Sequence, residues 1–128
     1  MKTPFVTKEQ VLEIAKQYPT PFYLYEEKGI RENARRVNEA FSWNKGFKEY
    51  FAVKATPNPF LLKILREEGC GVDCSSLTEL MMSEACGFSG SEIMFSSNVT
   101  PEEDYRFAKK LNAYINLDDF TDIEVLER

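Results

Sequence analysis

The feature that most constrains the fold is a regular alternation of short apolar segments and helical segments from residue 50 onward. Strands are expected at residues 51–54, 71–74, 92–96 and 113–117. Between them, apolar residues recur at helical spacing, and Pro59, Ser76–Glu79 and Thr100–Glu103 carry helix-start signals. Helical crossovers imply a parallel sheet with right-handed connections. The pattern therefore predicts an α/β fold, either an open doubly wound sheet or part of an eight-stranded barrel.

Chain length bears on this choice. A complete (β/α)8 barrel takes roughly 250 residues. The present chain has 128 residues, enough for a single domain with its own core. If it is a barrel, about four βα units would make its N-terminal half.

The segment before this alternation has a different pattern. A capping box at Thr7–Gln10 begins a helix that ends before Pro19. Phe22–Tyr25 is expected to be a short strand, and a longer helix follows it. Arg31, Glu32, Arg35 and Glu39 lie on one side of that helix and are expected to face solvent. We therefore expect an N-terminal helix at residues 1–19 and an incomplete half-barrel at residues 20–128.

Composition argues against several functional classes. Net charge is −5 and cationic residues do not cluster, which disfavours nucleic acid as a partner. No apolar stretch approaches the roughly 20 residues of a membrane span, and Met1–Gln10 lacks the apolar centre of a signal peptide. Cys70, Cys74 and Cys86 are an odd, scattered set in a chain without histidine. They suggest a reducing, cytoplasmic compartment, and no metal site is expected.

Lys54 is the unusual residue of the first expected strand. It follows the apolar residues Tyr50–Val53 and precedes Thr56–Pro59. Alternation along a strand places Lys54 on the same face as Ala52, with no carboxylate nearby in the sequence. A buried amine without a partner tends to lose its proton, and a neutral amine forms Schiff bases with carbonyl compounds. A lysine at a strand end can equally reach into solvent, so both interpretations stay open.

Polar residues also follow the next two expected strands. Asp73 and Ser75 stand at the end of the second, and Ser96–Asn98 at the end of the third. In a parallel barrel these ends converge on one mouth, and the small residues Gly71 and Ala52 would leave room below it for a ring-sized ligand. Asp73 could instead cap a helix or close a turn, and Ser96–Asn98 could be an ordinary turn.

Four segments together resemble one enzyme family. Phe51–Pro59 resembles the pyridoxal-phosphate lysine motif of the fold-type III decarboxylases, which act on diaminopimelate, ornithine, arginine or carboxynorspermidine. Gly71–Leu80 resembles their second-strand motif, Thr20–Tyr25 their entry strand and Ile115–Asp118 their fourth-strand segment. The related alanine racemases usually carry Tyr-Gly-His after the lysine, where this chain has Thr56–Pro59. The resemblance is closest to the diaminopimelate decarboxylases.

The resemblance implies a fold, a cofactor and a reaction. The fold would be the N-terminal half of a TIM barrel of the alanine racemase-like type. Lys54 would hold pyridoxal 5'-phosphate covalently, Ala52 would pack close to its ring and Asp73 would lie beside it. The reaction would convert a small amino acid, meso-diaminopimelate, to L-lysine and CO2, with ornithine, arginine and carboxynorspermidine as alternative substrates. The full-length enzyme would be a homodimer.

The chain lacks several family features. The family places a histidine on the cofactor ring, and this chain has none. A Gly-rich phosphate loop and a C-terminal β domain are also missing from the sequence. We therefore expect an N-terminal portion that is inactive alone. The alternative from another class is a non-catalytic binding or regulatory half-barrel.

Overall fold

The computed structural model describes residues 3–127, and its centre is a four-stranded parallel sheet. The strands are β1 (Tyr50–Ala52), β2 (Gly71–Cys74), β3 (Ile93–Ser96) and β4 (Tyr114–Asn116). They are joined by α3 (Pro59–Glu67), α4 (Leu77–Ala85) and α5 (Glu102–Lys110), and α6 (Asp122–Glu127) follows β4. The expected alternation of strand and helix is therefore present, with most strands shorter than the sequence suggested.

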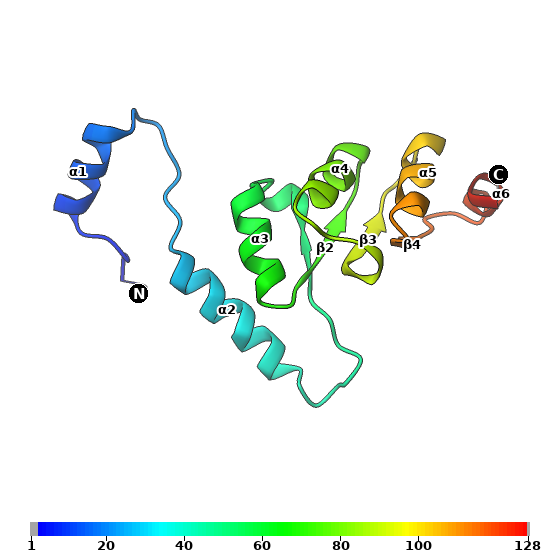
Figure 1. Ribbon diagram of the computed structural model, residues 1–128, viewed down its shortest axis with the longest axis horizontal. Helices are drawn as coiled ribbons and strands as arrows, with labels where there is room; N and C mark the ends of the chain where they lie inside the picture. The colour runs from blue at the N-terminus through cyan, green and yellow to red at the C-terminus, as the bar shows by residue number, and fades with distance from the viewer. Residues whose placement is uncertain (1–2, 128) are drawn as a thin grey trace.

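Strand order distinguishes the two expected architectures. The order is β1-β2-β3-β4, so every strand pairs with its neighbours in the sequence and the order never reverses. A doubly wound sheet would contain a reversal point with helices on both faces. Here α3, α4 and α5 form an arc along one side of the strands (Figure 1). This is the arrangement of half a (β/α)8 barrel.

The core lies between the sheet and this arc of helices. Its fully buried members include Leu62, Val72, Leu80, Ile93 and Phe95. Phe95 packs edge-on against Tyr105 of α5, with ring centroids 6.0 Å apart. The thiols of Cys70, Cys74 and Cys86 are free and buried, and burial raises the pKa of the Cys74 thiol to about 12. Within residues 3–127 no cluster of metal-binding side chains is found.

Local signals fix the ends of the helices. The Asn58 side chain accepts a hydrogen bond from the Phe60 amide and caps α3, which has Pro59 at its start. Gly69 follows the end of α3 with φ +84°, a conformation that glycine adopts most readily. The helix-start signal at Thr100–Glu103 predicts a capping box with Thr100 as the cap, and this is wrong, because Pro101 is the N-cap of α5 and no side chain caps this helix.

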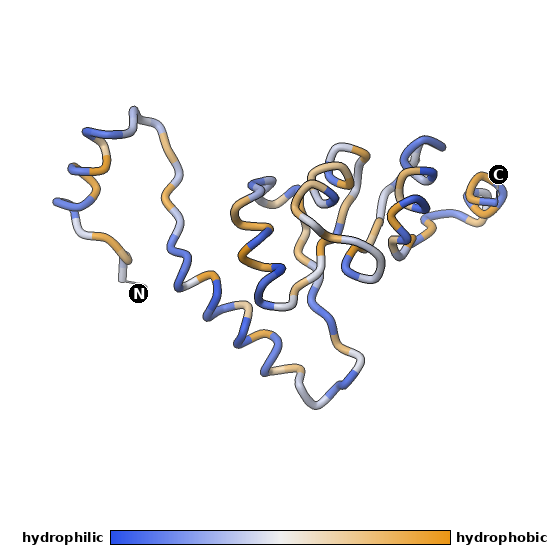
Figure 2. The backbone as a smooth tube through the Cα atoms, viewed as in Figure 1, coloured by the Kyte–Doolittle hydropathy of each residue, from blue (hydrophilic) through white to orange (hydrophobic). Residues whose placement is uncertain are grey.

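The N-terminal helix α1 (Lys8–Gln17) begins with the expected capping box. The Thr7 hydroxyl accepts from the Gln10 amide at 3.2 Å, and the Gln10 side chain accepts from the Thr7 amide at 2.7 Å. Figure 1 shows α1 apart from the sheet, and Figure 2 shows apolar positions along it; none of its residues is buried. None of the helices in the described part of the chain is both long and apolar enough to span a bilayer.

The short strand expected at Phe22–Tyr25 is wrong. These residues connect α1 to α2 (Glu27–Ala40) without joining the sheet, and the Tyr23 side chain is 89% exposed. An apolar, aromatic run fits a strand only where a neighbouring strand pairs with it and covers it. Within residues 3–127 no strand pairs with this segment.

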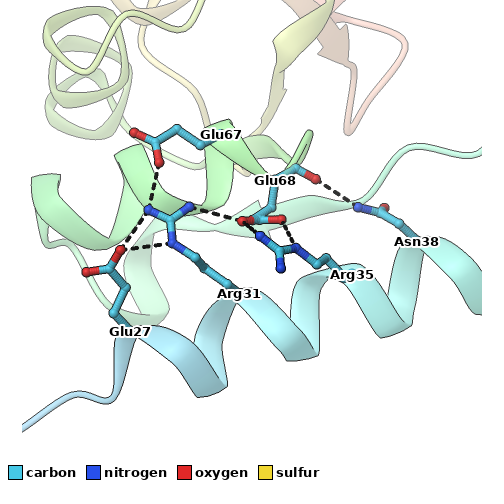
Figure 3. Close-up of polar contacts among 6 residues, drawn as sticks. All are labelled: Glu27, Arg31, Arg35, Asn38, Glu67 and Glu68. Atoms are coloured by element: carbon cyan, nitrogen blue, oxygen red, sulfur yellow. Dashed lines mark hydrogen bonds and ion pairs between the residues drawn. The ribbon is translucent and has the colours of Figure 1, made fainter.

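Most of the charged side of α2 is exposed as expected, but Arg31 is half-buried, because Arg31 and Arg35 bond to carboxylates at the end of α3 (Figure 3). Arg31 donates to Glu67 at 2.7 Å and to Glu68 at 3.0 Å, and Arg35 donates to Glu68 at 2.6 and 2.7 Å. Arg35 and then Arg31 hold the pKa of the Glu68 carboxyl below its ordinary value. We call Arg31, Arg35, Glu67 and Glu68 the α2–α3 clamp.

Candidate functional site

Lys54 lies in a 3-10 turn rather than at the end of a strand. β1 stops at Ala52, and the turn Val53–Ala55 follows, closed by a hydrogen bond from the Thr56 amide to the Val53 carbonyl at 3.1 Å. Val53 is fully buried in the core, whereas the Lys54 side chain is exposed. The expectation of a strand through residue 54 is therefore wrong, and of the two interpretations of Lys54 the solvent-exposed one holds. Any Schiff-base role for Lys54 must rest on its position and neighbours.

The amine of Lys54 contacts the end of the neighbouring strand. Its Nζ donates to Ser75 Oγ at 3.4 Å. Ser75 follows β2, and its backbone amide donates to Glu79 Oε2 of α4 at 2.9 Å. The ends of β1 and β2 thus meet at one edge of the sheet, as the barrel prediction required.

Asp73 lies on β2 beside this contact. It is the register partner of Ala52 on β1, and its carboxylate accepts a hydrogen bond from Ser96 Oγ of β3 at 2.5 Å. The helix that follows β2 is capped by Ser76, so Asp73 does not serve as its cap. Three neighbouring strand ends therefore present an amine, two hydroxyls and a carboxylate to one mouth.

Gly71 does not leave room for a ligand, contrary to expectation. A Cβ at Gly71 would lie 2.7 Å from the Tyr50 ring and 2.7 Å from the Glu92 carbonyl oxygen. The Tyr50 hydroxyl donates to the Ser91 carbonyl at 2.7 Å, which fixes the ring over the glycine. Tyr50 closes the amino end of this face, a role that sequence reasoning missed although its alternation with Ala52 was visible.

An apolar cavity of about 290 Å³ lies elsewhere, between α2, α3 and β1. Ile30, Ala34, Phe51, Leu65 and Cys70 contribute to its lining. Lys54, Asp73 and Ser75 do not line it. Its lining includes the Cys70 thiol and the Glu49 carboxylate, but burial raises the pKa of that thiol and makes it a poor nucleophile. Chemistry therefore favours the mouth around Lys54 as the candidate site.

The sequence of the chain matches one known protein family over most of its length. Residues 27–128 match the pyridoxal binding domain of the pyridoxal-dependent decarboxylases. The chain belongs to this family. The match confirms the family resemblance of Phe51–Pro59, Gly71–Leu80 and Ile115–Asp118, and it confirms the pyridoxal-type cofactor that the family uses. Thr20–Tyr25 lies outside the matched residues.

Relatives with curated names agree with this assignment. Protein TabA of Pseudomonas amygdali pv. tabaci is 43% identical over 112 residues, which cover 88% of this chain and 26% of that protein. The diaminopimelate decarboxylase of Methanothermobacter thermautotrophicus is 36% identical over 108 residues, covering 84% of this chain and 25% of that enzyme. The chain thus spans about a quarter of the length of these relatives.

Solved structures support the fold. A diaminopimelate decarboxylase from M. jannaschii superposes with a TM-score of 0.84 at 27% identity, covering 90% of this chain and 28% of that one. The lysine decarboxylase of Selenomonas ruminantium gives a TM-score of 0.87 at 24% identity, covering 98% of this chain and 34% of that one. The predicted N-terminal half-barrel of the pyridoxal-binding type is confirmed.

The side chains at the mouth fit one part of such a cofactor. A primary amine is the group that an aldehyde captures, and the Lys54 Nζ is exposed at the sheet edge where barrel enzymes bind ligands. Asp73, Ser75 and Ser96 supply a carboxylate and hydroxyls around it. Among the described residues, the mouth holds no Gly-rich loop at a helix start that could hold a phosphate. These side chains therefore fit the aldehyde end of the cofactor.

Proposed function

We propose that the whole protein is a pyridoxal-phosphate-dependent decarboxylase that converts meso-diaminopimelate to L-lysine and CO2. The observation that carries this proposal is the exposed Lys54 amine at the carboxyl edge of the sheet, in contact with Ser75. Membership of the decarboxylase family supports the reaction class. Relatives at 36% identity that are named diaminopimelate decarboxylase support the substrate.

Lys54 is proposed as the covalent anchor of the cofactor. When bound, pyridoxal phosphate supplies an electron sink for the charge left by a departing carboxylate. Lys54 would hold the cofactor through a bond from its amine nitrogen to the aldehyde carbon, with the aldehyde oxygen lost as water. Ser75 accepts a hydrogen bond from that amine and limits its orientations.

Asp73 and Ala52 are proposed to line the same cofactor site. The bond from Ser96 Oγ fixes the Asp73 carboxylate, so a negative charge stays at one place in the mouth. A fixed carboxylate favours positive charge on groups near it. The Ala52 side chain is small, and we propose that it packs close to the cofactor ring, since it lies beside Asp73 in the sheet register.

Further parts of the proposal concern the whole protein. We propose an N-terminal helical segment at residues 1–19, followed at residues 20–128 by the first half of the barrel. Its partners are expected to be a small amino acid and a second copy of the whole protein, without nucleic acid or membrane. Three buried free thiols support a cytoplasmic location.

Borohydride trapping tests the role of Lys54. The whole protein is incubated with pyridoxal phosphate, reduced, digested and mapped by mass spectrometry. A pyridoxyl group is expected on the peptide that contains Lys54, and Lys54→Ala should remove both the label and decarboxylation. Lys63→Ala is the matched control, because Lys63 lies on the adjacent helix α3, and it should leave both unchanged. A label on a different lysine would refute the assignment.

A substrate panel tests the reaction. The whole protein is assayed for CO2 release from meso-diaminopimelate, ornithine, arginine and carboxynorspermidine. Release from diaminopimelate at the highest kcat/KM is expected. A higher value for another substrate would replace the substrate but keep the reaction class, whereas a label on Lys54 without turnover of any amino acid would favour a binding module.

A further inference from the structure

Asp104 is a buried carboxylate that the proposed function does not use. It lies in the first turn of α5, and its residue is 6% exposed. Its Oδ2 accepts a hydrogen bond from the backbone amide of Leu77, the first residue of α4, at 3.0 Å. Within residues 3–127 no lysine or arginine pairs with Asp104.

Two helix starts explain how this charge is stabilised. The first amides of a helix have no intrahelical acceptor and carry partial positive charge. Asp104 lies in the first turn of its own helix and also accepts from the first amide of α4. The contact therefore joins the starts of two helices that follow neighbouring strands of the mouth.

This contact holds the turn that presents Ser75 to Lys54. Ser75 and the N-cap Ser76 directly precede Leu77. The turn is fixed from within by the bond from the Ser75 amide to Glu79 at 2.9 Å. Asp104, on α5, fixes the same turn from outside α4 through its bond to the Leu77 amide. The Ser75 hydroxyl on this turn lies 3.4 Å from the Lys54 amine.

We propose that Asp104 is a positioning residue for the cofactor-binding lysine. By fixing the β2–α4 turn, it keeps Ser75 Oγ at the distance from which it orients the Lys54 amine. This inference rests on the proposed function of Lys54. It assigns Asp104 no contact with substrate or cofactor.

The test removes the hydrogen bond from each side. Asp104→Ala removes the acceptor. Leu77→Pro removes the donor, and proline is tolerated at the first position of a helix; the extended Ser76 backbone, φ −158° and ψ 162°, suits a following proline. Leu77→Ala is the matched control, since it shortens the same side chain but keeps the amide. Asp104→Asn keeps an acceptor oxygen and is the conservative variant.

The first readout is the rate at which the cofactor-free whole protein incorporates pyridoxal phosphate at Lys54, measured by timed borohydride trapping. Losing a hydrogen bond to a charged group should slow incorporation about tenfold in Asp104→Ala and Leu77→Pro. Leu77→Ala and Asp104→Asn should stay near the wild-type rate. Ser75→Ala should be slowed similarly, and combining it with Asp104→Ala should add nothing, because both changes act through the same contact.

Hydrogen exchange of the cofactor-free protein gives a second readout. The Ser75 and Glu79 amides should exchange about tenfold faster in Asp104→Ala and Leu77→Pro, while the β3 amides keep wild-type protection. Wild-type incorporation rates in both variants, or slowing that multiplies with that of Ser75→Ala, would overturn the inference. If wild-type Lys54 incorporates no cofactor, the proposed function fails, and unchanged Ser75 exchange in the variants would overturn the positioning role separately.

Discussion

The two faces of the sheet differ in their side chains and in what covers them. On the face toward α3, α4 and α5, Val72, Ile93 and Phe95 are fully buried and apolar. On the opposite face, Asp73 and Ser96 are half-buried and bonded to each other. Successive residues of one strand point to opposite faces, so one residue can pack in the core while its neighbour in the sequence faces the candidate site. The comparison teaches that stability and candidate chemistry are carried by alternate residues of the same strands.

Phe95 and Ser96 give the strongest test of this separation, because they are adjacent on β3. Phe95→Ala should lower the free energy of unfolding by about 3–5 kcal/mol, since it removes a fully buried ring. Ser96→Ala should lower it by less, about 1.5–3 kcal/mol at most, the range for a hydrogen bond to a charged group such as the Asp73 carboxylate. Urea unfolding monitored by circular dichroism measures both values. Equal losses in the two variants would contradict the division between faces.

Gly71 lies on the same face as Asp73, but it is expected to matter for stability rather than for the candidate site. Gly71→Ala should destabilise the protein by about 1–3 kcal/mol, the range for overpacking, because the new methyl group meets the Tyr50 ring and the Glu92 carbonyl. Gly46→Ala is the control, since a Cβ there would lie 3.6 Å from its nearest neighbour, Asn44 Oδ1. Thermal unfolding of both variants compares them, and a tolerated methyl at Gly71 would mean that Tyr50 moves freely.

Disrupting the α2–α3 clamp, which lies away from both faces of the sheet, should have a smaller and pH-dependent effect on the free energy of unfolding. The pKa of Glu68 is lowered in the folded protein by Arg35 and Arg31, so its contribution is present above the unfolded-state value of 4.5. That contribution is lost as the pH falls through the lowered value. Glu68→Gln should therefore be less stable than wild type at neutral pH, and the two should converge in acid.

Unfolding curves at several pH values measure this effect. Glu39→Gln on α2 is the control, because the Glu39 residue is exposed and is not part of the clamp. It should follow the wild-type pH dependence. A constant difference between Glu68→Gln and wild type across the acid range would show that the charge of Glu68 is not what stabilises the clamp.

Local signals made most of the half-barrel predictable. The helix starts at Pro59 and Ser76 follow from side chains within a few residues, so the sequence contains their causes. The run at Phe22–Tyr25 has strand-like residues but lacks a pairing partner, and pairing is a property of distant segments. Arg31 was misplaced for the same reason, because its acceptors Glu67 and Glu68 lie on another helix.

The candidate site was predictable in its members more than in its geometry. Parallel strands bring their carboxyl ends together, which was enough to group Lys54, Asp73 and Ser96. The exposure of Lys54 depends on where β1 stops and a 3-10 turn begins, and strand ends are poorly marked by alternation alone. The anchor at Asp104 could not be foreseen, since its bond to the Leu77 amide crosses between two helices.

The turn that carries Lys54 has a mechanical consequence. Val53 is locked in the core and its carbonyl closes the turn, so the backbone at Lys54 is held in place. The exposed side chain is held by one long contact, from its amine to Ser75 Oγ at 3.4 Å. The amine of Lys54 can therefore move only by rotation about its side-chain bonds, while the backbone of the turn stays in place. An amine on such a side chain cannot move farther than the length of its four-carbon stem. It can therefore release a bound group and still stay close enough to bind it again.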